Sequence, residues 1–255
     1  MTDEKIATRL HVPAPLAERA EAAVDAAQSH RLRHVLRLLP GAAVAAFNAR
    51  DGEFLCRVVA LDRQRGRLSV ERRLRAPVLE AGPWLVFAPI RRQRLDLIIE
   101  KGTELGVAAF VPVVTARTQP ERPQRHRLVA QAIAAVEQSE RLSVPEIRAI
   151  EPLASLLAGW PRERRLVVCD ETGGGAPIAT ALAAFPPAAP AAILVGPEGG
   201  FAETELDGLR NLPFVTTVGL GPRVLRAETA ALAALAAFQA IAGDWRGTRP
   251  GHGRR

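Results

Sequence analysis

The chain has 255 residues, 48% of them hydrophobic, and a formal net charge of +7. This length and composition predict one large or two smaller packed domains and exclude a disordered protein. Cys56 and Cys169 lie far apart in the sequence, which argues against a disulfide framework or a zinc site. Residues 1–10 lack the apolar core of a signal peptide, and no apolar run is long enough to cross a bilayer, so we expect a soluble, cytoplasmic protein.

The positive charge is concentrated in the first two-thirds of the chain. Lys and Arg outnumber Asp and Glu by four in residues 1–80 and again by four in residues 81–165, but are outnumbered by one in residues 166–255. All but two of these basic residues are arginines, which bind phosphates and base edges bidentately. Codon bias explains part of the arginine excess but not its position. We therefore expect a nucleic-acid-binding front part joined to a part that binds a small ligand.

The first 83 residues predict a short helix followed by a small β-barrel. The helix is expected at residues 31–40. Its apolar positions, which we expect to face inward, are Leu32, Val35, Leu36 and Leu39. Short strands separated by turn-forming sequences are predicted at residues 42–48, 53–61 and 67–73. Such strands are typical of a small barrel, and the prolines and glycine of residues 74–83 indicate a linker.

From residue 84 onward, predicted strands and helices alternate, which favours an α/β fold with a mostly parallel sheet. The strands are expected at residues 84–90, 108–114, 166–169, 191–195 and 214–218. The helices are expected at residues 93–105, 123–138, 152–158, 178–185, 203–209 and 228–241. We therefore predict a barrel domain at residues 1–75, an α/β domain at residues 83–243 and a disordered tail at residues 244–255.

Two glycine-rich loops follow predicted strands near the C-terminus. The first is Gly196–Gly200 and the second begins at Gly219 and runs to Thr229. Loops at the carboxyl ends of neighbouring parallel strands share one crevice, where open α/β sheets bind ligands, and glycine lets the backbone approach a ligand closely. One such loop alone is common between a strand and a helix and does not indicate a ligand site. The triple glycine at residues 173–175 resembles a flexible loop and is weak evidence for function. The pair favours a ligand pocket.

Neither loop carries a known nucleotide fingerprint. No Gly-Lys-Ser/Thr follows Gly196 to hold phosphates and magnesium, and Val224 replaces the third glycine of a dinucleotide-binding loop. A nicotinamide-dependent oxidoreductase is therefore a weak alternative. No Ser-His-Asp arrangement and no metal-ligand spacing stands out, so nucleophilic and metal catalysis are not favoured.

Arg226 and Glu228 flank the entry to the last predicted helix. Glu228 is in the first helical turn, where a carboxylate is favourable as a simple cap. Arg226 has two interpretations that the sequence leaves open. It either pairs with Glu198 or Glu228, or it points into the crevice and stabilises charge that develops on a substrate.

There are two further basic stretches, and the first of them indicates an anionic partner. Arg91, Arg92 and Arg94 open a predicted helix, where positive charge works against the helix dipole. The second stretch consists of Arg117, Arg122, Arg125 and Arg127. A solvated helix start is the simpler interpretation of the first stretch.

Residues Ile193–Phe201 with Glu203 and Glu205, and residues Leu220–Ala230, resemble the RsmE family. Its members are 16S ribosomal RNA uracil-N3-methyltransferases of the SPOUT superfamily. Supporting matches lie at residues 34–38, 100–107, 137–141 and 144–147, so the resemblance covers nearly the whole chain. Glu140 departs from the glycine expected there, and arginines replace lysines near Arg91.

The resemblance implies a SPOUT α/β trefoil-knot domain with a small N-terminal PUA-like β-barrel domain. It implies S-adenosylmethionine as cofactor, 16S rRNA within the 30S ribosomal subunit as substrate, a homodimer as the active form, and neither a membrane nor a metal as partner. The cofactor-binding residues carried over are Leu194, Val195, Gly196, Glu198, Gly199, Leu220, Gly221, Leu225, Thr229 and Ala230. The RNA-binding residues are Arg31, Arg33, Arg37, Arg91, Arg92, Arg94 and Arg141.

The leading hypothesis is methyl transfer to N3 of a uridine in 16S rRNA. We assign Arg226 to stabilising the charge on the reacting base, with Glu228 or Glu198 holding it in place. No general base stands out. The alternative from another class is a non-catalytic RNA-binding or ribosome-assembly protein, which has no need of both glycine-rich loops.

Overall fold

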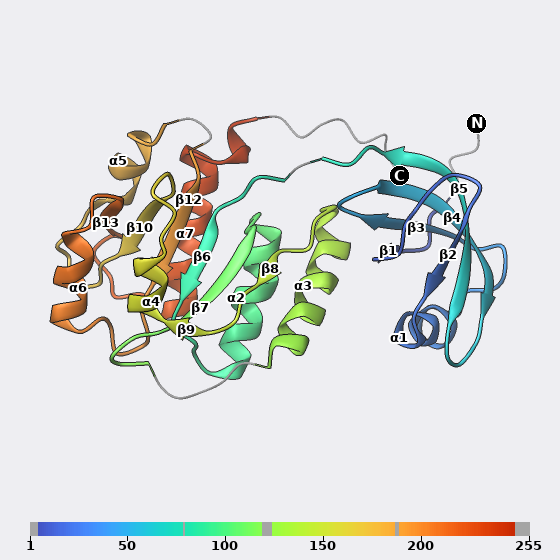
Figure 1. Cartoon of the computed structure of the whole chain (residues 1–255), viewed down its shortest axis with the longest axis horizontal. Helices are drawn as coiled ribbons and strands as arrows, with labels where there is room; N and C mark the ends of the chain where they lie inside the picture. Colours follow the sequence, from blue (N-terminus) through green and yellow to red (C-terminus); the bar gives the residue numbers. More distant parts are fainter. Residues whose placement is uncertain (1–4, 79, 119–123, 187–188, 248–255) are drawn as a thin grey trace. The chain divides into compact units, whose positions relative to one another are not determined.

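The computed structural model describes residues 5–78, 80–118, 124–186 and 189–247. These fall into two compact units (Figure 1). The first comprises the described residues of Met1–Glu80 together with Val136–Val144, and the second those of Ala81–Ala135 and Pro145–Thr248. The first unit is therefore discontinuous in sequence, which the sequence did not predict.

A five-stranded sheet in the order β1-β3-β4-β5-β2 forms the first unit. The strands are β1 (Arg9–His11), β2 (Glu21–Val24), β3 (Ala43–Asn48), β4 (Gly52–Leu61) and β5 (Gly66–Arg75). Only the pair β1 and β3 is parallel, and the others are antiparallel. The three longer strands match the predicted ones, whereas β1 and β2 are too short to give a clear pattern in the sequence.

The helix expected at residues 31–40 starts earlier and ends earlier. It consists of α1 (Ala26–His30), with Asp25 as the N-cap, continued by a π-helical turn at Arg31–Val35. Leu32 is fully buried, but Val35 is 66% exposed and Leu39 is 74% exposed. The prediction that the later apolar residues, including Leu36, face inward is therefore wrong. The wider π turn breaks the 3.6-residue spacing on which the prediction depended.

Arg9 in β1 holds the carboxyl end of α3 (Arg125–Ser139) within the first unit. Its Nη atoms donate to the last carbonyls of the helix and the following loop, at 2.9–3.0 Å; these belong to Val136, Glu137 and Arg141. Its Nε donates to Glu53 at 2.6 Å, and both side chains are almost completely buried. The guanidinium also stacks over the ring of Phe47. One arginine therefore satisfies carbonyls that a helix end leaves unpaired.

Glu140, in the loop after α3, adopts a φ of +63°. This left-handed region favours glycine, which explains why glycine is the residue expected at this position. The carbonyl of Glu140 accepts a hydrogen bond from Arg75 at 2.9 Å.

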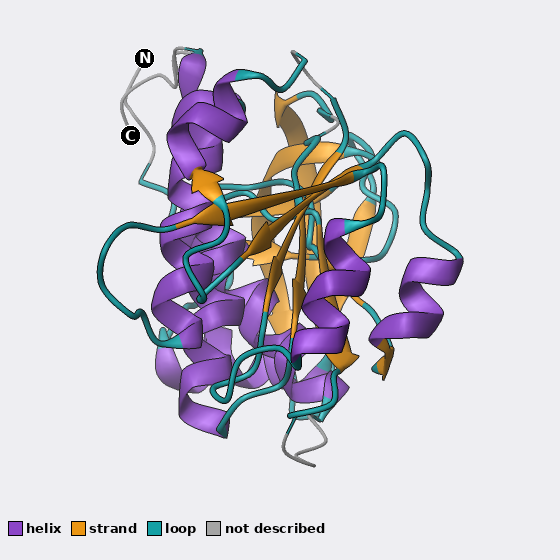
Figure 2. Ribbon diagram, turned by 90° about the vertical axis from the view of Figure 1, so that its left-hand side faces the viewer, coloured by secondary structure: helices purple, strands orange, loops and turns teal. Residues whose placement is uncertain are grey.

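The second unit contains a sheet in the order β11-β13-β10-β12-β6-β7-β8, in which every pairing is parallel (Figure 2). Its strands are β6 (Trp84–Phe87), β7 (Ala109–Val114), β8 (Glu146–Ile147), β10 (Arg165–Cys169), β11 (Ala176–Pro177), β12 (Ala191–Val195) and β13 (Val215–Gly219). The short strand β9 (Glu151–Pro152) also pairs with β7. The predicted parallel α/β sheet is confirmed.

Helices cover both faces of this sheet (Figure 2). Besides α3 they are α2 (Arg92–Glu104), α4 (Leu153–Ala158), α5 (Ile178–Ala183), α6 (Glu203–Arg210) and α7 (Ala227–Ile241). Leucines of α4 and α6 share a buried cluster with alternate strand residues such as Val168 and Leu194. Helix α7 packs against α2, α5 and β12. Among the described residues, no helix combines the length and apolarity needed to cross a bilayer.

The two strands that precede the glycine-rich loops were expected to be neighbours in the sheet, and they are not. The strands β12 and β13, which carry the two glycine-rich loops, are not neighbours, because β10 lies between them and pairs with both. The loop after β10 therefore lies between the two predicted loops. Local sequence patterns carry no information on strand order, so this insertion could not be predicted from them.

The C-terminal segment leaves α7 as a short 3₁₀ helix at Asp244–Arg246. It is held to α7 by Gln239, which accepts a hydrogen bond from the Asp244 N–H and donates one to the carbonyl of Leu105. Most of the segment for which we predicted disorder, from residue 248, lies outside the described residues, as does Arg122.

Candidate functional site

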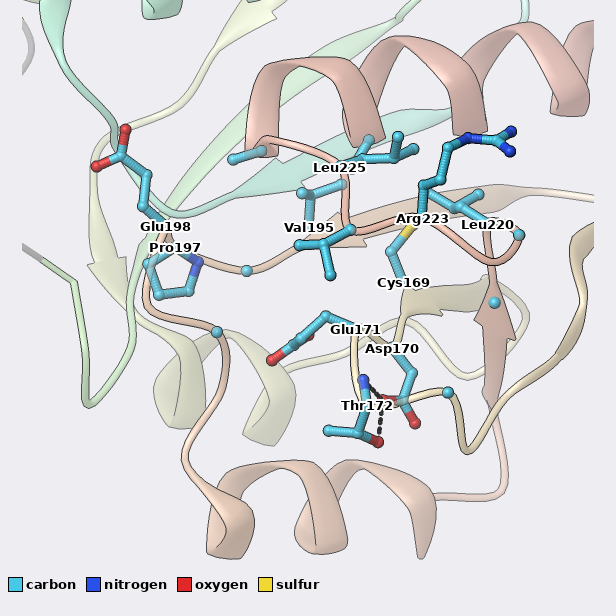
Figure 3. A pocket seen from close by; sticks show the side chains of 18 of the residues that line it. Cys169, Asp170, Glu171, Thr172, Val195, Pro197, Glu198, Leu220, Arg223 and Leu225 are labelled. Atoms are coloured by element: carbon cyan, nitrogen blue, oxygen red, sulfur yellow. Dashed lines mark hydrogen bonds between the residues drawn. The ribbon is translucent and has the colours of Figure 1, made fainter.

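A pocket of about 330 Å³ opens where β10, β12 and β13 end (Figure 3). Its wall comes from three loops and the start of α7. The lining residues are Cys169, Asp170, Glu171, Thr172, Gly173, Val195, Gly196, Pro197, Glu198, Gly200, Gly219, Leu220, Gly221, Pro222, Arg223, Val224, Leu225, Ala227 and Ala230. Val195 and Leu225 face it from one side, and Glu171 and Thr172 lie opposite them (Figure 3). The two predicted loops thus share a pocket, with a third loop between them.

The loop after β12 is shaped by close contacts that require glycine. At Gly196, a Cβ atom would lie 2.9 Å from the ring of Phe201. Gly200 has a φ of +70°, and a Cβ there would lie 2.2 Å from Oε1 of Glu171. The same Glu171 oxygen accepts a hydrogen bond from the N–H of Phe201 at 2.9 Å. The β12 loop is therefore fastened to the β10 loop at this point.

The loop after β10 was not among the predicted site segments. Asp170 organises it: Oδ1 accepts hydrogen bonds from the N–H and hydroxyl of Thr172, and Oδ2 pairs with Arg210 at 2.7 Å. Gly175 brings the loop against β13, since a Cβ there would lie 2.6 Å from the backbone of Val218. The signal was present in the sequence, because the predicted strand ends at Cys169 and polar residues follow it at the same sheet edge.

The two titratable side chains at the start of this loop have shifted pKa values. Burial raises the pKa of the Cys169 thiol to about 12, so the thiol stays protonated at neutral pH and is not a nucleophile. For Asp170, burial opposes ionisation, but the hydrogen bonds from Thr172 and Arg210 outweigh it and lower the pKa below its ordinary value of 3.8.

Replacing Asp170 by asparagine is expected to lower the free energy of unfolding at pH 7 more than at acid pH. Because the folded-state pKa is depressed, the ionised carboxylate stabilises the protein above the unfolded-state pKa, and this contribution is lost as pH falls through the folded-state pKa. Urea unfolding at pH 7 and at about pH 3 measures the difference. Asp207→Asn is the matched control, since Asp207 pairs with the same Arg210 but is 60% exposed. An Asp170→Asn loss that does not shrink in acid would contradict this assignment.

The loop after β13 leads into α7 at Arg226, its N-cap residue. Gly221 turns the loop with a φ of +98°, and Leu220 and Leu225 line the pocket. Arg226 is exposed and stands in the chain between two lining residues, Leu225 and Ala227. Within the part of the chain that the structure describes, its guanidinium makes no ion pair, and Arg226 is not itself among the residues that line the pocket.

Glu198 and Glu228 do not hold Arg226 through their side chains, contrary to the expectation from the sequence. Both pair with Arg94 of α2, Glu198 at 2.6 Å and Glu228 at 3.4 Å. This pairing joins residues 104 and 134 positions apart, which a local pattern does not reveal. Glu228 is 9% exposed, and its Oε2 is buried without a hydrogen-bond partner among the described residues. Buried polar atoms without a partner are few in native proteins.

Seven of the ten predicted cofactor-binding residues line the pocket: Val195, Gly196, Glu198, Leu220, Gly221, Leu225 and Ala230. The other three lie elsewhere. The side chain of Leu194 is buried in the sheet core, Thr229 is exposed on α7, and Gly199 lines a second, smaller hollow.

The predicted RNA-binding arginines differ in solvent exposure and in ion pairing. In the first unit Arg33 and Arg37 are exposed and Arg31, also exposed, pairs with Glu137, whereas Arg141 is mostly buried against Glu80. In the second unit Arg91 and Arg92 are exposed, whereas Arg94 is half-buried between its two carboxylates. The described residues bring no three His, Cys, Asp or Glu side chains together as a metal site would.

The sequence and the fold of the chain are similar to those of known RNA methyltransferases. Residues 81–239 match the model of the RNA methyltransferase domain family. Ribosomal RNA small subunit methyltransferase E from Rickettsia conorii is 29% identical, over 89% of this chain and 93% of that protein. Its counterpart from Mycobacterium bovis is 30% identical, over 89% of this chain and 88% of that protein. The crystal structure of ribosomal RNA small subunit methyltransferase E from Neisseria gonorrhoeae bound to S-adenosyl methionine is 26% identical, with a TM-score of 0.80, over 93% of this chain and 99% of that one.

Proposed function

The chain belongs to the RsmE family of ribosomal RNA small subunit methyltransferases, and we propose from this premise that it methylates N3 of one uridine in 16S rRNA. S-adenosylmethionine is the methyl donor. The second unit has the SPOUT α/β trefoil-knot fold, and the small curled sheet of the first is PUA-like. The observation that carries the proposal is the pocket at the ends of three parallel strands; Arg226, exposed and without an ion pair among the described residues, follows its lining residue Leu225 in the chain.

The pocket residues fit S-adenosylmethionine. A volume of about 330 Å³ lies within the range of small-molecule pockets, about 300–1,000 Å³. Apolar side chains such as Val195, Leu220 and Leu225 suit the adenine ring, and the small Ala230 leaves room beside it. The glycines of the loops expose backbone N–H and C=O groups that can fix its orientation.

When bound, S-adenosylmethionine supplies an electrophilic methyl group on its sulfonium. N3 of uracil is a weak acid, so negative charge develops on N3 and its flanking carbonyl oxygens as the N3 proton is lost. We assign the stabilisation of that charge to Arg226, because a fixed cation at the developing charge lowers the barrier. Glu228 anchors the first turn of α7 through Arg94, and in this way it holds Arg226 at the helix entry.

The proposed partners are 16S rRNA in the 30S subunit and a second copy of the chain, in the cytoplasm. Exposed arginines support the first: Arg31, Arg33, Arg37, Arg91 and Arg92. The small exposed residues Thr229, Ala233 and Ala240 on one side of α7 support close packing in a homodimer. Sedimentation equilibrium tests the dimer directly.

Transfer of labelled methyl groups to 30S subunits and to naked 16S rRNA, with mapping of the modified base, tests the function. We expect a product at N3 of one uridine. A product on another nucleotide would overturn the specificity. Calorimetry with S-adenosylmethionine distinguishes a methyltransferase from a non-catalytic RNA-binding protein. The latter would give neither a methylated product nor heat of cofactor binding.

Gly200→Ala is expected to weaken S-adenosylmethionine binding about tenfold or more. A left-handed backbone costs an alanine about 1–2 kcal/mol, and the added Cβ would collide with Glu171 and unfasten the β12 loop from the β10 loop. Calorimetry gives the affinity. Gly208→Ala in α6 is the matched control, because a Cβ there meets nothing within 4 Å, and alanine favours a helix. Equal affinities for the two variants would show that the tight contact at Gly200 has no role in the pocket.

A further inference from the structure

A second hollow, of about 100 Å³, lies at the same edge of the sheet as the pocket. It is built from the segments that follow β6, β7 and β12. Its lining residues are Pro89, Ile90, Arg91, Arg117, Pro197, Glu198 and Gly199. Pro197 and Glu198 also line the cofactor pocket, so these two residues form the wall between the two spaces.

The hollow is positively charged. Arg91 and Arg117 are both exposed, whereas the one carboxylate of the lining, Glu198, pairs at 2.6 Å with Arg94, which it shares with Glu228 at 3.4 Å. Arg117 is oriented by its own contacts, since one Nη donates to the carbonyl of Gly199 at 3.0 Å. The turn that carries it is closed by hydrogen bonds from the N–H of Thr115 to the hydroxyl of Thr118 and between their two hydroxyls. One arginine is therefore pre-organised and the other is free to adjust.

The size and the charge of the hollow restrict the anion that it can take. Its volume of about 100 Å³ is less than a third of the 330 Å³ of the cofactor pocket. Small-molecule pockets span about 300–1,000 Å³, so a single small group suits the hollow better than a whole nucleoside. Arginine guanidinium groups bind phosphate oxygens with charge-assisted hydrogen bonds. The chemistry of the hollow is therefore that of a single phosphate.

We propose that this hollow binds one phosphodiester group of the RNA backbone next to the target nucleotide. The inference rests on the proposed function, because a methyl acceptor must reach the cofactor pocket. RNA whose base enters the pocket passes over the shared wall of Pro197 and Glu198, which places an adjacent phosphate at Arg91 and Arg117. The subsite thereby fixes the register of the target nucleotide.

The test measures binding of a 16S rRNA hairpin that contains the unmethylated target uridine, with single methylphosphonate linkages placed on either side of it. For the wild-type protein, one neutral linkage is expected to weaken binding about tenfold, the order of one lost charge-assisted hydrogen bond. Arg117→Gln and Arg91→Gln are each expected to weaken binding of the unmodified hairpin to a similar extent. In these variants the neutral linkage should cause little further loss, because its partner is already gone.

Arg92→Gln is the matched control, since Arg92 is exposed on the same helix but does not line the hollow. The loss of hairpin binding caused by Arg92→Gln should add to the loss caused by the neutral linkage. Additive losses for both Arg91→Gln and Arg117→Gln would overturn the subsite. Unchanged S-adenosylmethionine affinity in the variants shows that the loop remains intact. Binding is measured apart from turnover, so a hairpin that binds in register without being methylated would instead count against the proposed function.

Discussion

Replacing Arg226 by alanine is expected to reduce kcat for methyl transfer about 100- to 1,000-fold, the range found when one pre-organised group that stabilises developing charge is removed. The side chain stands at the N-cap of α7 between two pocket-lining residues and has no recorded ion pair among the described residues. Its removal therefore leaves no unpaired carboxylate behind. Single-turnover methylation of 30S subunits, with calorimetry of S-adenosylmethionine, separates lost chemistry from lost cofactor binding.

Two further variants make the Arg226 prediction specific. Arg226→Lys keeps the charge but not the planar fork, so it should recover part of the rate. Arg162→Ala removes an exposed arginine that precedes β10, at the opposite end of that strand from the pocket, and should leave kcat nearly unchanged. Near-normal methylation by Arg226→Ala would remove this residue from the mechanism.

Arg9→Met is expected to lower the free energy of unfolding by about 3–5 kcal/mol, which is the cost of breaking a buried ion pair by removing one partner. Among the described residues, Arg75 at 3.3 Å is then the one ion-pair partner left to Glu53. Two carbonyls in the last turn of α3 and one in the following loop would also lose the hydrogen bond from Arg9. Methionine has a similar length and is apolar, so the loss reports the missing charge and hydrogen bonds rather than a cavity.

Urea unfolding monitored by circular dichroism measures the effect of Arg9→Met. Arg67→Met is the matched control, because Arg67 pairs with Glu21 at 3.2 Å but both side chains are more than half exposed. An exposed pair of this kind contributes at most about 1 kcal/mol. Similar losses for the two variants would mean that the buried network around Arg9 contributes no more than a surface ion pair.

The regular elements of the second unit were predictable because each strand is a short apolar run and each helix has its own periodicity. Strands β12 and β13 and the glycine-rich loops after them lie where the sequence indicated. The insertion of β10 between them was not predictable, because it depends on how the chain crosses over the sheet. The third loop of the pocket, with Asp170 at its start, was therefore not placed between the other two, although the polar residues after Cys169 marked the same edge of the sheet.

The partners of the charged residues were predicted least well. Arg226 was expected to pair with Glu198 or Glu228, the acidic residues of the two loops, but both pair with Arg94 on another helix. Proximity in sequence suggested the first pairing, whereas the packing of α2 against α7 decides the second. The same limit applies to Arg9, whose partners at the end of α3 are more than 120 residues away.

The discontinuity of the first unit has a consequence for its synthesis. Its strands leave the ribosome within the first 75 residues, but Val136 and Leu142, which pack with Phe47, follow much later. A nascent chain of 100 residues therefore has an incomplete first unit, with Arg9 and Glu53 paired but no helix end to hold. Likewise, a truncated protein that begins at Ala81 would carry residues 136–144 without their packing partners. An attempt to express the catalytic unit alone must replace the apolar residues of that segment.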